Sequence, residues 1–165
     1  MKRQKVIYFH GWKSSPDSDK VKYLSEFFDV VSPAIPEDYN TAIRELDIVV
    51  SQNPDAILVG TSLGGYWANT MAQLWGLASC IINPSCQPNK TLGIDYPDLV
   101  VGSTSAHRSV LLSTDDTVLN HTIAETLFSE KAVIKKFDNC GHRFNKYDVI
   151  KSEICLLSNH QCDHI

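Results

Sequence analysis

The sequence predicts one α/β domain over residues 1–165, a three-layer sandwich in which helices cover both faces of a mostly parallel sheet of about six strands. A chain of 165 residues has the length of a single domain and can bury its own core. Short apolar runs alternate with amphipathic segments, which is typical of a parallel sheet with helical crossovers. Several runs are apolar at consecutive positions, as expected when both faces of a sheet are buried.

The candidate elements follow one another in strand–helix order. The six apolar runs predicted to be strands are Val6–Phe9, Asp29–Ser32, Ala56–Gly60, Ser79–Asn83, Ser109–Ser113 and Ala132–Phe137. Apolar residues recur at helical spacing in five further segments, namely 21–28, 43–50, 67–75, 119–127 and 147–157.

Residues that favour helix ends flank three of these segments. Ser15-Pro16 suits an N-cap followed by proline at the first helical position, so the first helix is expected to begin there. Asn40 and Thr41 are both candidate caps of the second helix. Gly76 is expected to end the third helix, whose apolar stripe of Trp, Met and Leu residues should pack in the core.

The segment Pro84–His107 does not fit the strand–helix alternation. It contains three prolines and two glycines, so it is predicted to be a long excursion after the fourth strand. Long loops in small domains are usually functional, and this one follows a strand end. We therefore expect a small lid or a substrate wall there.

Charge and composition exclude several classes of protein. The net charge is −4, and 43% of residues are hydrophobic against 21% charged, which excludes a disordered chain, collagen and a coiled coil. The longest basic cluster lies within the first five residues, so a nucleic-acid partner is not expected. Only four apolar residues follow that cluster, too few for an export signal or a membrane span. A cytoplasmic location and no membrane partner are expected, and the five cysteines are predicted to be free thiols.

The motif that points most directly to chemistry is Gly60-Thr61-Ser62-Leu63-Gly64. It joins a predicted strand to a predicted helix, which is the context of the G-x-S-x-G nucleophile elbow of α/β-hydrolases. Small flanking residues permit a strained turn that raises the serine hydroxyl above the sheet edge. The P-loop lysine and a complete GxGxxG are both missing, which disfavours a nucleotide site.

A serine nucleophile needs a histidine base oriented by a carboxylate, in the chain order Ser, Asp, His. Of the six histidines, His142 alone follows the last predicted strand and precedes the last helix. Asp116 follows the fifth strand and is the predicted acid, with the adjacent Asp115 as the open alternative. Asp138 lies on the same loop as His142, an unfavourable direction for orienting its ring.

The oxyanion of such a reaction needs two backbone N–H donors. The residue after the nucleophile, Leu63, is the first expected donor. The second is Trp12, which follows His10-Gly11 directly after the first strand. His10 is expected to be structural, and the aromatic side chains of Trp12 and Tyr66 are candidates for contacting substrate.

The motifs in this order resemble the α/β-hydrolase superfamily and, within it, the small bacterial YqiA/YcfP-like esterases. The matching stretches are Tyr8–Trp12, Ser14–Lys20, Gly60–Ala68, Ile82–Pro84, Asp116–Leu119 and Gly141–Phe144. The resemblance implies ester hydrolysis with Ser62 as nucleophile, Asp116 as acid and His142 as base. Where that family usually has Gly-Asp at the acid, this chain has Asp115-Asp116, and Pro84–His107 looks shorter than its counterpart.

The sequence thus favours a serine hydrolase, free of metal and cofactor, that cleaves a small carboxylic ester or thioester through an acyl-enzyme. A chain of this length leaves no room for a large cap domain, so we expect an open site walled mainly by Pro84–His107 that accepts small or exposed acyl groups. Two alternatives stay open. One is a non-catalytic binding or regulatory protein on a hydrolase scaffold. The other is a cysteine-dependent enzyme using Cys86 or Cys140.

Overall fold

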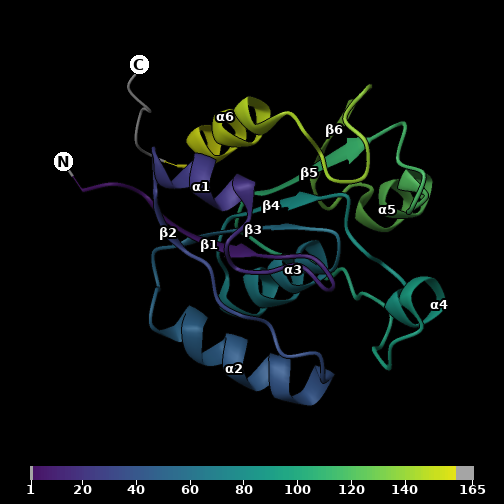
Figure 1. Ribbon diagram of the computed structural model, residues 1–165, viewed down its shortest axis with the longest axis horizontal. Coiled ribbons are helices and arrows are strands. Elements are labelled where there is room, and N and C mark those ends of the chain that lie inside the picture. The colour runs from purple at the N-terminus through teal and green to yellow at the C-terminus, as the bar shows by residue number, and fades with distance from the viewer. Residues whose placement is uncertain (1, 159–165) are drawn as a thin grey trace.

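A single parallel sheet runs through the molecule in the computed structural model, which describes residues 2–158 (Figure 1). Its strand order is β2-β1-β3-β4-β5-β6, and every neighbouring pair is parallel. The predicted fold class is confirmed. The elements in chain order are β1 (Lys5–Phe9), α1 (Asp19–Ser25), β2 (Asp29–Val31), α2 (Tyr39–Ser51), β3 (Ile57–Thr61), α3 (Leu63–Trp75), β4 (Ser79–Ile82), α4 (Pro88–Leu92), β5 (Arg108–Ser113), α5 (His121–Phe128), β6 (Val133–Phe137) and α6 (Tyr147–Leu157).

Helices cover the two faces of the sheet unequally. Alternate strand residues such as Ile7 and Leu58 pack with α2, α3 and α5, whereas Val6 and Val59 on the opposite face pack with α1 and α6. Figure 1 shows α1 and α6 together on one side of the sheet and α2 and α3 on the other. The central strands are buried on both faces, which explains their consecutive apolar residues. Among residues 2–158, no helix is both long and apolar enough to cross a bilayer.

The helix ends depart from the prediction at two places. Ser18, rather than Ser15-Pro16, caps α1, because its hydroxyl accepts a hydrogen bond from the Val21 N–H. Asp38 caps α2 by accepting from the Thr41 N–H at 2.9 Å, so Asn40 and Thr41 lie inside that helix. A carboxylate one position before the helix provides a charged acceptor for the free N–H groups.

The third predicted helix ends where expected, but it begins at Leu63, before the predicted segment 67–75, and only part of its buried face is as predicted. Gly76 ends α3 in the left-handed conformation, as predicted, and Trp67 and Met71 are buried. Leu74 and Trp75 are 62% and 42% exposed, so the expected core stripe does not reach the end of the helix. The Trp75 indole N–H instead donates to Asp47 on α2.

The cysteines do not all behave as predicted. Cys80, Cys86 and Cys140 are buried free thiols. Cys155 on α6 is disulfide-bonded, so the prediction of five free thiols is wrong at that position. Cys162 lies outside the described residues.

The segment Pro84–His107 is packed against α3 rather than extended into solvent. It contains the short helix α4, and Tyr96, Leu99 and Val101 are buried in the core cluster that includes α3. The Leu99 N–H donates to the Cys86 carbonyl at 2.8 Å, which closes the segment on itself. Its apolar side chains are therefore used for packing.

Two glycines allow α3 to approach the ends of β1 and β3. A Cβ added to Gly64 would lie 1.8 Å from the Phe9 carbonyl oxygen, and one added to Gly60 would lie 2.0 Å from the Gly64 carbonyl oxygen. Real side chains do not fit at such distances, so these positions require glycine. The turn between Gly60 and Gly64 is thereby held directly beside the end of β1.

We predict that Gly64→Ala lowers the free energy of unfolding by about 3 kcal/mol or more, because backbone must move to relieve the clash. The helix propensity of alanine offsets only about 1 kcal/mol of this loss. Gly102→Ala is the matched control, since the nearest atom to its added Cβ is a Gln73 side-chain oxygen at 3.7 Å. Urea unfolding of the two variants measures the difference, and equal stabilities would contradict the packing argument.

Candidate active site

The carboxyl ends of three parallel strands bring Ser62, Asp116 and His142 together. Ser62 lies between β3 and α3, Asp116 follows β5, and His142 follows β6. The His142 Nε2 lies 3.1 Å from the Ser62 Oγ, and its Nδ1 lies 2.8 Å from the Asp116 Oδ2. Residues up to 80 positions apart in the sequence thus form one chain of hydrogen bonds.

Ser62 occupies a strained backbone conformation. Its φ of 63° and ψ of −120° lie in a region that non-glycine residues rarely adopt, at a cost of about 1–3 kcal/mol. The surrounding backbone fixes this conformation, because the Ser62 N–H donates to the Ile82 carbonyl and the Ser62 carbonyl accepts from Gly65 and Ser85. The strain is characteristic of a nucleophile elbow.

The hydrogen bonds fix the roles of the two ring nitrogens of His142. Asp116 Oδ1 accepts from the Val118 and Leu119 N–H groups at 2.8 and 2.9 Å, and Oδ2 faces the histidine. An ionised carboxylate can only accept, so Nδ1 carries the hydrogen and Nε2 is free to accept from the Ser62 hydroxyl. This is the tautomer that a general base needs.

The Asp116 carboxylate stays ionised although its side chain is only 2% exposed. Burial by itself raises the pKa of Asp116. The hydrogen bonds from His142 and from the Leu119 and Val118 backbone outweigh burial, so the pKa of this carboxyl is lowered.

Asp115 and Asp138 have different partners. Asp115 Oδ1 accepts from the Cys140 and Gly141 N–H groups, each at 3.2 Å, and so holds the backbone of the loop that carries His142. Asp138 accepts a hydrogen bond from the Thr114 hydroxyl. Of the three carboxylates considered, the structure places Asp116 against the imidazole.

Asn83 also holds the histidine loop, a role that sequence reasoning missed. Its side-chain amide donates to the His142 carbonyl at 2.9 Å and to the Ser113 hydroxyl at 3.0 Å, and its Oδ1 accepts from the Ser113 N–H at 2.8 Å. Asn83 is buried and has a positive φ of 41°. The sequence feature that could have indicated this role is an asparagine followed by proline, Asn83-Pro84, at the end of a buried strand.

The loop after β1 lies over the elbow. Atoms of Thr61 and Ser62 lie within 3.6 Å of a Cβ placed on Gly11, and Trp12 lines the same cavity as Ser62. Leu63 is the first residue of α3, so its N–H has no acceptor within the helix. Both expected oxyanion donors therefore lie on segments that border Ser62.

His10 fixes this loop and is not placed to act as a base. Its Nε2 accepts from the Ile35 N–H at 3.2 Å, and its Nδ1 donates to the Gly11 carbonyl at 2.9 Å. Both ring nitrogens are used in structural hydrogen bonds, and the side chain is buried.

The cavity in front of Ser62 has a volume of about 710 Å³. Most of its lining comes from the loop after β1 and the start of α1, and the rest comes from the elbow and from the loops before α5 and α6. Leu92 alone represents Pro84–His107 in the lining, so the prediction that this segment forms the main wall is wrong. Its side chains are packed against α3 instead.

Of the two aromatic residues expected to contact substrate, only Trp12 lines the cavity. Tyr66 is 2% exposed, and its hydroxyl donates to the Pro97 carbonyl. Its ring packs against Trp67 and Tyr96. The expectation for Tyr66 is therefore wrong, because the helix turns this residue toward the core.

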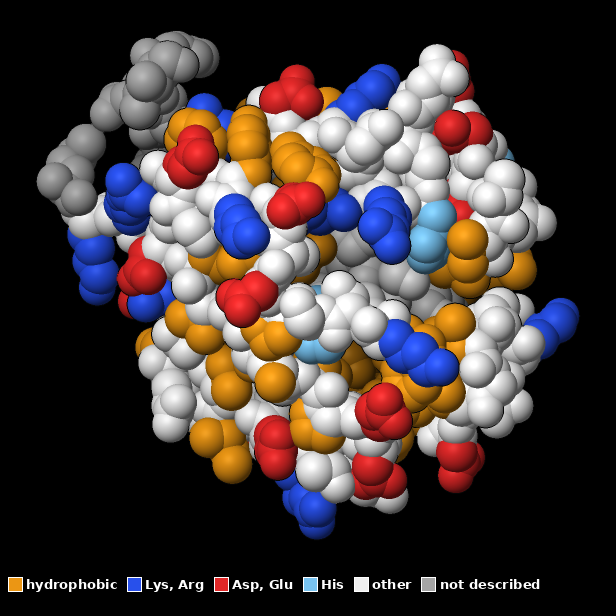
Figure 2. All heavy atoms as spheres, viewed as in Figure 1, with side chains coloured by type: hydrophobic (Ala, Val, Ile, Leu, Met, Phe, Trp, Pro, Cys, Tyr) orange, Lys and Arg blue, Asp and Glu red, His pale blue; other side chains and the backbone are white. Residues whose placement is uncertain are grey.

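The cavity wall is rich in charge. Lys13, Lys20 and Arg143 line it together with Asp17 and Asp19. Figure 2 shows Lys or Arg side chains next to a histidine at a recess of this face.

Lys20 differs from the other charged residues of the wall because it is buried. It is 9% exposed, and its Nζ lies 5.3 Å from the centre of the Tyr147 ring. Burial and then the charge of Arg143 lower the pKa of Lys20 to about 8, and the charge of Asp19 opposes this with a smaller effect.

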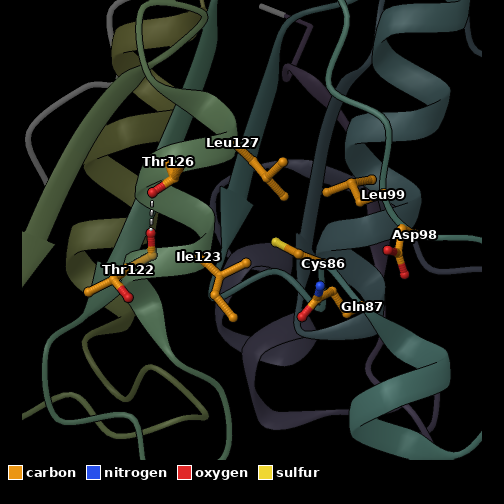
Figure 3. A pocket seen from close by; sticks show the side chains of 8 residues that line it. All are labelled: Cys86, Gln87, Asp98, Leu99, Thr122, Ile123, Thr126 and Leu127. Carbon is orange, nitrogen blue, oxygen red and sulfur yellow. Dashed lines mark hydrogen bonds between the residues drawn. The ribbon is translucent and has the colours of Figure 1, made fainter.

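A second cavity, of about 310 Å³, lies between α5 and the start of α4 (Figure 3). It is lined by Cys86, Gln87, Asp98 and Leu99 on one side and by Thr122, Ile123, Thr126 and Leu127 of α5 on the other.

Burial raises the pKa of the Cys86 thiol to about 12, so it is not a ready nucleophile. Burial also raises the pKa of Cys140, whose thiol donates to the Asp138 carbonyl. The geometry disfavours a cysteine-dependent enzyme.

We predict that the charge of Lys20 destabilises the folded protein near neutral pH. Between pH 8 and 10.5 the unfolded lysine holds a proton that the folded one has lost, so this group makes stability rise with pH. The difference in unfolding free energy between wild type and Lys20→Met should change by about 1–3 kcal/mol from pH 7 to pH 10. Lys22→Met, an exposed change on the same helix, is the control. A pH-independent difference in urea unfolding would refute this interpretation.

Known proteins of similar structure share this fold. A protein of the alpha/beta hydrolase superfamily from Xanthomonas campestris superposes with a TM-score of 0.77 at 20% identity, covering 95% of this chain and 98% of that one. An alpha/beta hydrolase enzyme from a sediment metagenome of the Mar Chica lagoon superposes with a TM-score of 0.67 at 19% identity, covering 93% and 89%.

Sequence comparison identifies the family. Relatives from Vibrio parahaemolyticus and Pasteurella multocida, both called UPF0227 proteins, are 24% and 27% identical, and each alignment covers 86% of this chain and 92% of the relative. The model of the uncharacterised protein family UPF0227 matches residues 5–98, more than half of the chain. The protein therefore belongs to the UPF0227 family and has the α/β-hydrolase fold.

Proposed function

We propose that this protein is a serine hydrolase that cleaves a small carboxylic ester or thioester through an acyl-enzyme. The observation that carries the proposal is the hydrogen-bonded chain Ser62–His142–Asp116 at a cavity of about 710 Å³. The fold shared with the Mar Chica alpha/beta hydrolase enzyme adds support.

Acylation begins at the Ser62 hydroxyl. As Ser62 Oγ attacks the acyl carbon, His142 Nε2 takes its proton across the 3.1 Å hydrogen bond. The Asp116 carboxylate, 2.8 Å from Nδ1, stabilises the imidazolium that forms. Because Asp116 is held by two backbone N–H groups, the ring is already oriented before substrate binds.

The negative charge of the tetrahedral intermediate develops on the carbonyl oxygen. We assign its stabilisation to the N–H groups of Leu63 and Trp12, with the positive N-terminal end of α3 directed at the same place. His10 supports this arrangement by fixing the loop that contains Trp12.

His142 then donates its proton to the leaving alcohol or thiol, and the acyl group stays on Ser62. In the second half of the reaction a water takes the place of the leaving group, His142 removes its proton, and the acid product departs. Lys13, Ser14 and Ser15 in the lining of the cavity are exposed, so water has access. This openness favours small or exposed acyl groups over long buried chains.

Labelling with a fluorophosphonate probe tests the proposal. The folded wild-type protein should form an adduct on Ser62, identified by mass spectrometry of the peptide, because this hydroxyl is activated by His142. Ser62→Ala should abolish labelling, whereas Ser51→Ala, at an exposed serine ending α2, should not. Absence of an adduct on Ser62 would favour a non-catalytic binding protein on the same scaffold.

Paired isosteric substitutions separate the two adjacent carboxylates. Asp116→Asn should lower kcat by about 10³-fold or more, because an amide can present an N–H to Nδ1 and impose the wrong tautomer. Asp115→Asn keeps an oxygen for the Cys140 and Gly141 N–H groups and should lower kcat less than about tenfold. Steady-state kinetics on a p-nitrophenyl ester measure both, and the reverse ranking would assign the acid to Asp115.

A further inference from the structure

The cavity that contains Ser62 has a buried cation with no carboxylate partner. Lys20 is 9% exposed, and within residues 2–158 no carboxylate lies within ion-pair distance of it. Its ammonium group also forms no hydrogen bond among these residues, whereas the other two buried, fully charged side chains of the described region are ion-paired or hydrogen-bonded. Glu153 pairs with Lys135 at 2.8 Å, and Arg108 donates to the Gly102 carbonyl and to Gln73.

We propose that Lys20 and Arg143 form a binding site for an anionic group of the substrate, a carboxylate or a phosphate monoester. The inference rests on the proposed hydrolase function, and it names the substrate class of that same cavity. Both cations line the cavity together with Ser62 and His142. Lys13 adds a third positive side chain on the same wall.

Electrostatics explain why an anion is the fitting ligand. Burying an ammonium group without a counter-charge is unfavourable, and a second cation nearby makes it more so. Both effects lower the pKa of Lys20. Burial is the larger cause, and the charge of Arg143 is the next. A bound anion would offset the cost of burying the ammonium group and the repulsion between the two cations. The Arg143 guanidinium can bind such an anion through two parallel hydrogen bonds.

The two carboxylates of the wall do not fill this role. Asp17 and Asp19 are exposed, and neither forms an ion pair with Lys20 or Arg143 among the described residues. Exposed charges are largely screened by water and salt, whereas Lys20 is shielded. The attraction for an anion therefore comes mainly from Lys20, and the exposed Arg143 adds hydrogen-bond donors at the edge of the cavity.

Matched ester pairs locate the anion on the substrate. Mono-p-nitrophenyl glutarate is compared with p-nitrophenyl valerate, whose acyl chain has the same length but no carboxylate. This pair tests recognition of a carboxylate on the acyl side of the substrate. On the leaving-group side, 4-carboxyphenyl acetate and 4-phosphonooxyphenyl acetate are each compared with 4-methylphenyl acetate. For each pair the measured quantity is the ratio of kcat/KM for the anionic ester to that for the neutral ester, which isolates recognition of the charge.

Charge removal at the wall should lower this ratio for at least one pair. Lys20→Met and Arg143→Met are each expected to lower it about tenfold or more, because a charge-assisted hydrogen bond is lost. Lys20→Arg should retain most of the ratio, and Lys22→Met, which changes net charge equally away from the cavity, should retain all of it. An unchanged ratio in both Met variants for every pair would overturn the proposal. Arg143 is exposed, so its variant is informative even if Lys20→Met does not fold.

A binding measurement distinguishes failure of this inference from failure of the proposed function. If no ester is hydrolysed and Ser62 is not labelled, the hydrolase proposal fails. Titration of benzoate and phenyl phosphate into Ser62→Ala, followed by NMR, still tests the anion site. Affinity about tenfold weaker after adding Lys20→Met supports the site, and equal affinity with and without Lys20→Met overturns it.

Discussion

The close approach of α3 to the ends of β1 and β3 is the constraint on which the rest of the site depends. Gly60 and Gly64 permit it, since a side chain at either position would collide with backbone at 2.0 Å or less. This contact forces Ser62 into its strained conformation and leaves its hydroxyl at the carboxyl edge of the sheet. It also brings the N-terminus of α3 beneath the loop after β1, so the proposed nucleophile and the proposed oxyanion donors are positioned by the same packing contact.

The histidine reaches Ser62 because neighbouring strands hold its loop from two sides. Asn83, at the end of β4, donates to the His142 carbonyl, and Asp115, after β5, accepts from the Cys140 and Gly141 N–H groups. These contacts bind backbone rather than the imidazole, so they set where the loop lies, and Asp116 then sets how the ring is turned. The position and the orientation of the His142 ring are thus controlled by different residues.

Local pattern and chain order made the strands, the elbow and the grouping of Ser62, Asp116 and His142 predictable. The elements that escaped prediction depend on tertiary contacts. Helical spacing gives no indication that Tyr66 faces Pro97 rather than the cavity, or that the proline-rich segment packs on α3. Asn83 was missed because its role consists of hydrogen bonds to residues 30 and 59 positions away. The helix caps were misplaced because Ser18 and Asp38 compete with equally suitable neighbours.

Two unfavourable features of the folded chain lie at the same cavity. The backbone of Ser62 is strained, and among the described residues Lys20 forms neither an ion pair nor a side-chain hydrogen bond, whereas the buried Glu153 is ion-paired and the buried Arg108 is hydrogen-bonded. A scaffold kept only for its stability would gain by relaxing both, since a different turn and an apolar residue would serve packing better. Functional sites are where such local costs are retained. Their coincidence at one cavity argues for a site that binds and transforms a ligand, and the sign of the buried charge argues that this ligand is an anion.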